Sequence, residues 1–163
     1  MGDRQKQVFG FDNFAGFTQL TDKDGAASEE MHKNVGGYDS SRFEEPLEDA
    51  ISIYDKDRFI PYKARVKLVK GNIEETVPQF VKDNPGLRIS LLHFDCDMYS
   101  PTMTGLKYLY PLVVSGGAIL FDEYGLRPWE GESNAVDEFF ADKDVIIKRF
   151  DWASNPAGYI IKK

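Results

Sequence analysis

The stretch Leu91–Tyr99, LLHFDCDMY, decides the fold of this chain. Its apolar half is typical of a buried strand, which ends in two carboxylates, Asp95 and Asp97. An ionised Asp is rarely buried without a partner, so acids that close an apolar strand indicate a metal ion, a cationic ligand or a proton-transfer role. A second apolar run, GAILFDE at residues 117–123, also stops at two acids. Two such strands side by side would bring their acidic ends together.

Length and composition predict one globular domain. With 163 residues and 42% hydrophobic content, the chain can bury one core. The formal charge of -7 and the scattered Lys and Arg residues offer no basic surface for nucleic acid. No apolar stretch is long enough to cross a bilayer, and the polar start does not predict a secretory signal. Because Cys96 is the only cysteine, no internal disulfide can form, and we expect a cytoplasmic protein without nucleic-acid or membrane partners.

The hydrophobic periodicity predicts strands that alternate with helices. We expect strands at Val8–Phe11, Ala64–Val69, Ile89–Phe94, Ala118–Phe121, Val145–Phe150 and Gly158–Ile161, and helices at Phe43–Tyr54, Ile73–Lys82, Thr102–Val113 and Asn134–Phe140. Ser115–Gly117 is expected to be a turn. The polar segment 18–42 predicts a long mobile loop or lid with one helical turn at most. Nearly all-apolar strands alternating with helices are typical of an α/β fold with a mostly parallel sheet, here with an antiparallel hairpin formed by the last two strands.

Helix caps are predicted at two places. Asn72, with Glu75 three residues later, has the spacing of a capping box. Ser100 followed by Pro101 predicts a helix that starts beside Asp97. Asn72 also has a second interpretation, because a residue beside the ligand crevice can face a ligand.

Acidic residues follow three of the predicted strands: Asp12, then Asp95 and Asp97, then Asp122 and Glu123. In open parallel sheets, ligands bind outside the carboxyl ends of the strands. Asp12 stands where nucleotide-binding domains place an acid for ribose hydroxyls, although it is equally explained as a turn-forming residue. No glycine-rich nucleotide fingerprint precedes the first strand, and no phosphate-binding loop occurs anywhere in the chain.

Asp95, Asp122 and Glu123 are the expected ligands of one hard cation such as Mg²⁺, which leaves Asp97 free as a base. The alternative is that these acids cap helices or pair with surface arginines. His93 and Asp95 also match the first half of an iron-binding facial triad. We consider this unsupported, because the only other histidine, His32, lies upstream in the polar segment.

Four stretches resemble the macrocin O-methyltransferase family, most strongly the enediyne deoxysugar methyltransferases: VFGFDNFAGF at 8–17, GNIEETVP at 71–78, FDCDMYSPT at 94–102 and FDEYG at 121–125. The resemblance implies a Rossmann-like class I fold. It also implies a methyltransferase that depends on S-adenosylmethionine and Mg²⁺ and modifies a sugar hydroxyl of a nucleotide-deoxysugar or a glycosylated natural product. A non-catalytic Rossmann-like domain and a metal-dependent phosphate-ester hydrolase remain the alternatives.

The resemblance also implies roles for individual residues. The metal ligands fall on Asp95, Asp122 and Glu123, and the base falls on Asp97. The cofactor contacts fall on four residues at the strand ends: Asp12, Asn13, Asn72 and Asp95. Many relatives have Ser at the position of Asn13, Asp at the position of Asn72 and Asp at the position of Glu123.

One feature of the family is absent from this sequence: the first strand and its glycine-rich loop. We therefore expect residues 1–163 to form a single, N-terminally truncated methyltransferase domain. The gap should fall between the strands at Val8–Phe11 and Ile89–Phe94. Its exposed edges favour pairing with another chain, so we expect a homo-oligomer and weak cofactor binding by this chain alone.

Overall fold

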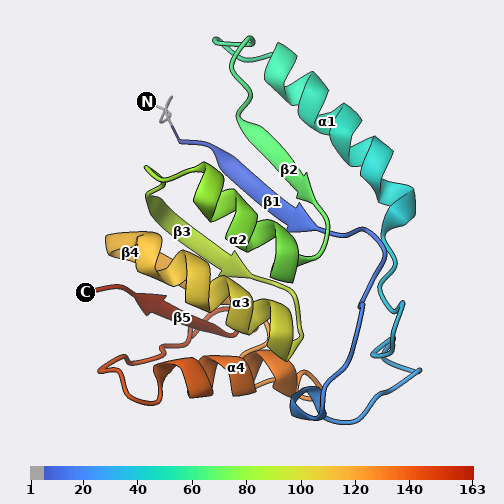
Figure 1. Cartoon of the computed structure of the whole chain (residues 1–163), viewed down its shortest axis with the longest axis vertical. Helices are drawn as coiled ribbons and strands as arrows, with labels where there is room; N and C mark the ends of the chain where they lie inside the picture. The colour runs from blue at the N-terminus through green and yellow to red at the C-terminus, as the bar shows by residue number, and fades with distance from the viewer. Residues whose placement is uncertain (1–5) are drawn as a thin grey trace.

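The computed structural model describes residues 6–163 and contains two small β-sheets (Figure 1). The first is a parallel pair, β1 (Val8–Asp12) and β2 (Val66–Lys70). The second sheet has the order β3-β4-β5 and comprises β3 (Ile89–Phe94), β4 (Val113–Phe121) and β5 (Gly158–Ile161). β4 runs parallel to β3 and antiparallel to β5. The predicted α/β class, with mostly parallel strands and an antiparallel C-terminal strand, is confirmed.

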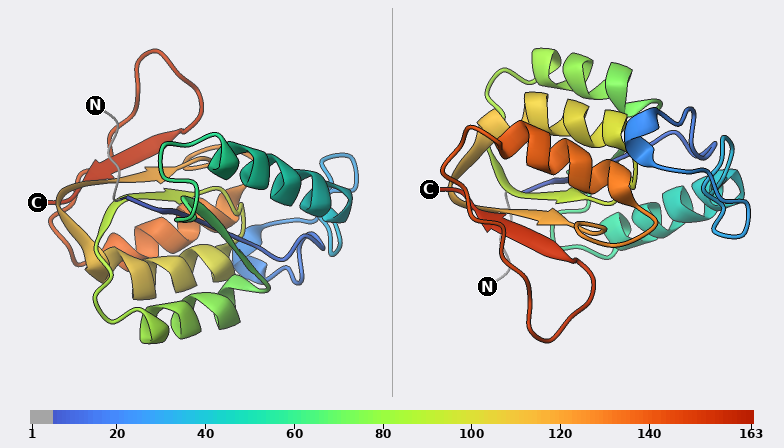
Figure 2. Two further views of the ribbon diagram at one scale, coloured as in Figure 1. Left: turned by 90° about the horizontal axis from the view of Figure 1, so that it is seen from above. Right: turned by 90° about the horizontal axis from the view of Figure 1, so that it is seen from below.

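The helices cover the two faces of the sheets unequally, as Figure 2 shows. Three helices lie together on one face: α2 (Ile73–Asp83), α3 (Tyr99–Leu109) and α4 (Glu130–Phe140). α1 (Glu44–Lys56) lies on the opposite face, and none of its residues is buried. The apolar side of α1 is therefore exposed, with Ile53 at 68%. No helix among residues 6–163 is long and apolar enough to span a membrane.

The core lies between the β3-β4-β5 sheet and helices α2, α3 and α4. Ile119 and Phe121 of β4, Leu106 of α3 and Val136 of α4 are completely buried. The rings of Phe94 and Phe121 stack with their centroids 5.5 Å apart, because the two residues are paired across β3 and β4. Burying one such ring contributes about 1.5–3 kcal/mol. This packing holds the carboxyl ends of β3 and β4 at the same level, so the acids that follow them meet.

The predicted interruption of the sheet is present. Among residues 6–163, no strand ladder joins β1 to β3, and each strand pairs only on its other side. Val8 on β1 and Leu91 on β3 are both more than half exposed. The expected self-association through these edges stays a prediction.

The strand bounds differ most from the prediction in two places. Residues 115–117, expected to be a turn, lie inside β4, which starts at Val113 because α3 ends early at Leu109. The expected strand Val145–Phe150 is reduced to one bridge between Lys148 and Tyr159, so the predicted hairpin is wrong in its first strand. The side chains of this segment still alternate, because Val145 and Ile147 pack against the core while Ile146 is exposed. Periodicity therefore indicated burial correctly, while the ladder formed between β5 and β4 instead.

Gly105 tests how tightly α3 packs on β3. A Cβ atom at this position would lie 2.4 Å from Cε1 of Phe94. Gly105→Ala should destabilise the protein by about 1–3 kcal/mol through overpacking, despite the intrinsic helix preference of alanine. Urea unfolding measures the change. The matched control is Gly86→Ala, where a Cβ meets nothing within 4 Å, and equal stability of the two variants would contradict this packing.

Candidate active site

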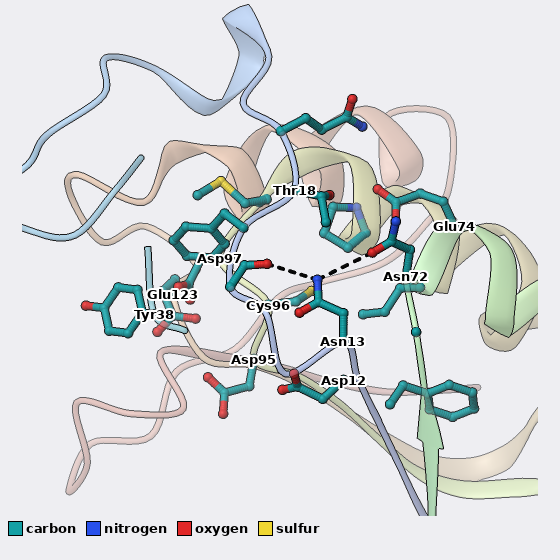
Figure 3. A pocket seen from close by; sticks show the side chains of 18 of the residues that line it. Asp12, Asn13, Thr18, Tyr38, Asn72, Glu74, Asp95, Cys96, Asp97 and Glu123 are labelled. Atoms are coloured by element: carbon teal, nitrogen blue, oxygen red, sulfur yellow. Dashed lines mark hydrogen bonds between the residues drawn. The ribbon is translucent and has the colours of Figure 1, made fainter. Parts of the chain in front are cut away.

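A cavity of about 350 Å³ opens at the carboxyl ends of the strands (Figure 3). It is lined by the ends of β1 and β3, by the start of α2 and by the loops around them; the lining includes Asp12, Asn13, Asn72, Asp95, Asp97 and Glu123. In Figure 3, Asp97, Glu123 and Tyr38 gather on one side of the cavity, and Asn72 and Glu74 lie on the other. Six of the seven predicted site positions therefore share one pocket, and Asp122 is the exception.

The acids converge as a cluster of three. One carboxylate oxygen from each of Asp95, Asp97 and Glu123 lies within 4.8 Å of the other two. Asp97 reaches this position with a left-handed backbone, φ 60°, which Asp tolerates better than most residues and which is common at functional sites. β3 has already ended at Phe94, so it is this turn, not strand alternation, that aims Asp97 into the cavity.

Asp122 does not belong to this cluster of mutually close carboxylates. Its Oδ2 accepts a hydrogen bond from Nδ2 of Asn155 at 2.8 Å, and its Oδ1 lies 3.3 Å from Nε2 of His93. The ring of His32 lies against Tyr38 instead of near His93, so the two histidines do not form a facial triad. The geometry brings together two of the three predicted ligands, Asp95 and Glu123, with Asp97 beside them.

The cluster pays an electrostatic cost for its burial. Burial raises the pKa of Glu123 above its usual range, and the negative charges of Asp97 and Glu132 raise this pKa further. Burial likewise raises the pKa of Asp97, and a hydrogen bond with Glu123 opposes this shift in part. Burial and the charge of Asp122 raise the pKa of Asp95. Each shift has the sign expected of carboxylates that lack a positive partner.

The residues present fit a divalent cation. Oε2 of Glu123 is buried without a hydrogen-bond partner, although burying an unpaired carboxylate oxygen is costly. The cluster offers only carboxylate oxygens, the ligands that Mg²⁺ prefers. A bound cation would compensate both the repulsion and the unpartnered oxygen.

The residues expected to contact a cofactor extend from Asp12, which lies beside Asp95, to Asn72 on the far side of the pocket (Figure 3). Oδ1 of Asp12 accepts the backbone N–H of Phe14 at 2.6 Å, so Asp12 also shapes the turn after β1. Nδ2 of Asn13 donates to the carbonyl of Gly16 at 2.9 Å and lies 3.4 Å from Oδ1 of Asn72. These contacts hold the ends of β1 and β2 together at the edge of the cavity.

Asn72 does not cap α2 through its side chain, so the predicted capping box is wrong. Its backbone carbonyl accepts the N–H groups of Glu75 and Thr76, as at any helix start. The side chain instead faces Asn13 and the cavity. The second interpretation of this residue, that it faces a ligand crevice, matches the geometry.

The cap of α3 comes from a distant part of the chain. The helix begins at Tyr99, not at Thr102, and its first N–H donates to Oδ1 of Asp24 at 2.6 Å. Ser100 is therefore not the N-cap. Asp24 lies 75 residues upstream in the polar segment, 1% exposed, and its other oxygen binds the backbone and hydroxyl of Thr21. Sequence spacing could not reveal this cap, because it depends on a tertiary contact.

Lys33 anchors the same segment. It is 1% exposed, its Nζ donates to the carbonyls of Asp24 and Pro128, and it lies 3.3 Å from Oε2 of Glu130. Residues 18–42 contain the 3-10 turn Asp22–Asp24, a bridge between Ser28 and Lys33 and the start of a second 3-10 turn, Ser41–Phe43. The buried side chains of Asp24 and Lys33 fasten this segment beside α3 and α4. Whether the segment also moves as a lid stays a prediction.

Three aromatic rings form a wall next to the acids: Phe17, Tyr38 and Trp129. The Tyr38 ring centroid lies 5.6 Å from that of Phe17 and 5.8 Å from that of Trp129. All three side chains line the cavity. Such faces suit the C–H side of a sugar ring or another flat apolar group.

Comparison with known proteins places the chain in a family. The sequence profile of the macrocin-O-methyltransferase (TylF) family matches residues 1–155. The chain belongs to this family. The mycinamicin III 3''-O-methyltransferase of Micromonospora griseorubida is 29% identical over 121 residues, which is 74% of this chain and 45% of that protein.

Solved structures of methyltransferases share the fold. The calicheamicin methyltransferase CalS11 superposes with a TM-score of 0.86 at 25% identity, over 95% of this chain and 60% of that one. An apo structure of CalS11, described as a TDP-rhamnose 3'-O-methyltransferase of calicheamicin biosynthesis, gives a TM-score of 0.73 at 26% identity, over 95% of this chain and 58% of that one. This chain therefore spans only about half to three fifths of the length of these relatives.

Loss of the Lys33 anchor should free the polar segment. Lys33→Met keeps the apolar stem but removes the ammonium group that binds the carbonyls of Asp24 and Pro128. We expect proteases to cut within residues 18–42 several times faster, because local opening exposes the backbone. Limited proteolysis with mass spectrometry measures this. Lys107→Met, at an exposed position on α3, is the control, and identical cleavage of both variants would contradict the anchoring role.

In the absence of a cation, stability should fall as the pH rises. Burial raises the pKa of Glu132 from 4.5 to about 8, so between these values the folded protein holds a proton that the unfolded chain has released. Stability then decreases by up to about 1.4 kcal/mol per pH unit for each such group. Thermal unfolding in EDTA measures the slope, which Glu132→Gln should reduce. A melting temperature that increases with pH across this window would contradict the assignment.

Proposed function

We propose that this chain carries the catalytic pocket of an S-adenosylmethionine- and Mg²⁺-dependent O-methyltransferase that modifies a sugar hydroxyl. The observation that carries the proposal is the convergence of Asp95, Asp97 and Glu123 in one cavity, in a chain of the macrocin-O-methyltransferase family. The same cavity is lined by Asp12 and Asn72 at the ends of neighbouring strands, which suits a nucleoside. Asp95, next to Asp12, is common to the proposed cation and cofactor sites.

The names of the relatives support the class of acceptor. One relative is named for methylation of mycinamicin III, and another is described as acting on TDP-rhamnose, a nucleotide-deoxysugar, in calicheamicin biosynthesis. The aromatic wall of Phe17, Tyr38 and Trp129 supports the same class, because it offers flat apolar faces beside acids that attract hydroxyl groups. We propose a deoxysugar, free as its nucleotide or attached to a natural product, as the acceptor.

Each residue has a proposed role in the transfer. When bound, S-adenosylmethionine supplies an electrophilic methyl group, and a divalent cation supplies positive charge that acidifies the accepting hydroxyl. Asp95 and Glu123 would hold the cation, together with Asp122 after its carboxylate turns from Asn155. Asp97 accepts the hydroxyl proton as the oxygen takes the methyl group. Asp12, Asn13 and Asn72 bind the nucleoside part of the cofactor and so fix the direction from which the methyl group arrives.

Substitution of Asp97 separates the base from the ligands. Asp97→Asn should leave Mn²⁺ affinity within about threefold, while methyl transfer falls by about 10²–10⁴-fold because the proton acceptor is lost. Calorimetric Mn²⁺ titration and transfer of labelled methyl groups to TDP-rhamnose measure the two quantities. Asp95→Asn and Asp122→Asn are the matched variants, which should weaken cation binding by at least about tenfold.

The outcomes distinguish the alternatives. Full turnover by Asp97→Asn would remove this residue from the mechanism, and lost Mn²⁺ binding in the same variant would make Asp97 a ligand instead of the base. Wild-type protein that binds neither Mn²⁺ nor S-adenosylmethionine would support the non-catalytic reading. Hydrolysis of p-nitrophenyl phosphate that Asp95→Asn abolishes would favour the phosphate-ester hydrolase.

A further inference from the structure

Glu132 stands directly behind the acid cluster and lies outside the set of predicted site residues. It occupies the first turn of α4 and is completely buried. Its backbone N–H donates to the carbonyl of Asp97 at 3.1 Å, and its Oε1 accepts the backbone N–H of Glu123 at 2.9 Å. One residue therefore bonds to both of the loops that carry the acids.

Gly131, the residue before Glu132, is packed too closely against its neighbours to carry a side chain. A Cβ atom on Gly131 would lie 2.2 Å from Oδ1 of Asp24, 2.7 Å from the backbone N of Tyr99 and 3.0 Å from the carbonyl of Asp97. The start of α4 is thus packed against the backbone that follows β3. Because this contact sets the position of the helix, the side chain of Glu132 sets the position of Glu123 relative to Asp97.

Glu132 is retained at an energetic cost. Its Oε2 is one of two buried side-chain polar atoms without a hydrogen-bond partner among residues 6–163, and the other is Oε2 of Glu123. Burying a carboxyl oxygen without a hydrogen-bond partner is costly. Its oxygens do not belong to the set of mutually close ligand atoms, which comes from Asp95, Asp97 and Glu123. A direct ligand role therefore does not account for it, whereas the bond to the Glu123 backbone does.

We infer that Glu132 is a positioning residue of the cation site: by accepting the Glu123 N–H, it holds the Glu123 carboxylate at the distance from Asp95 that a shared ion requires. The inference rests on the proposed function, since it assumes that the cluster binds a divalent cation. Outer contacts of this kind typically change metal affinity 10- to 100-fold when they are removed.

Two variants of similar length test this role on the full chain. Glu132→Gln keeps an oxygen that accepts the Glu123 N–H, whereas Glu132→Met fills the same volume without an acceptor. Electron paramagnetic resonance of free Mn²⁺ measures the affinity, and thermal unfolding in EDTA measures folding. Glu138→Ala removes an exposed carboxylate from the same helix and serves as the control.

Glu132→Met should fold and bind Mn²⁺ about 10- to 100-fold more weakly than the wild type, while Glu132→Gln and Glu138→Ala stay within about threefold. Wild-type affinity in Glu132→Met would overturn the inference. An equal loss in the Gln and Met variants would also overturn it, because the acceptor would then not matter. Should Glu132→Met fail to fold, loss of affinity in the folded Gln variant alone still overturns the inference, and retention by it supports it. Absence of Mn²⁺ binding by the wild type would instead refute the proposed function.

Discussion

Repulsion between carboxylates in a half-buried pocket is the constraint on which the rest of this structure depends. Asp95, Asp97 and Glu123 converge although their charges oppose convergence, and burial raises the pKa of each. Packing elsewhere must help to hold them there, because the hydrogen bond between Asp97 and Glu123 opposes this repulsion only in part. The stacked rings of Phe94 and Phe121 provide part of this packing, because they fix the level at which β3 and β4 end.

The loops beyond the strands are held by buried polar contacts, which are more directional than apolar packing. Asp24 caps α3, Lys33 binds the carbonyls around Asp24 and Pro128, and Glu132 bonds to both acid-bearing loops. These contacts join the polar N-terminal segment to the region around α4. The result is a pocket with an acidic side, an aromatic wall and an edge lined by Asn13 and Asn72, although the chain spans only part of the length of its relatives.

The sequence predicted the architecture and most of the pocket because these depend on local signals. Apolar runs that end in acids located β3 and β4, and the rule for parallel sheets placed their acids at one edge.

The same local signals gave wrong predictions where a contact between distant parts of the chain takes the place of a local one. Ser100 has the spacing of a cap but Asp24 occupies that place, and Asn72 turns its side chain toward Asn13 instead of its own helix. Asp122 follows the same strand pattern as Asp95, yet Asn155 and His93 hold it aside.

Glu132 and Lys33 carried no usable signal, because an acid in a helix and a lysine in a polar segment are normally solvated. Only their burial distinguishes them. Helix α1 is the opposite case. Its sequence is clearly amphipathic, yet its apolar side stays exposed among residues 6–163. Patterns in sequence therefore report what an element can bury, and the assembled fold decides what it does bury.

The most direct test of the central claim is an anomalous difference map from crystals grown with Mn²⁺. We expect one peak at the carboxyl ends of β3 and β4, within bonding distance of Asp95 and Glu123. The same map shows whether Asp97 or Asp122 is the third protein ligand of the ion. Crystals grown with Mn²⁺ whose map shows no peak between Asp95 and Glu123, or shows Mn²⁺ only at other positions, would contradict the claim that these carboxylates bind a divalent cation.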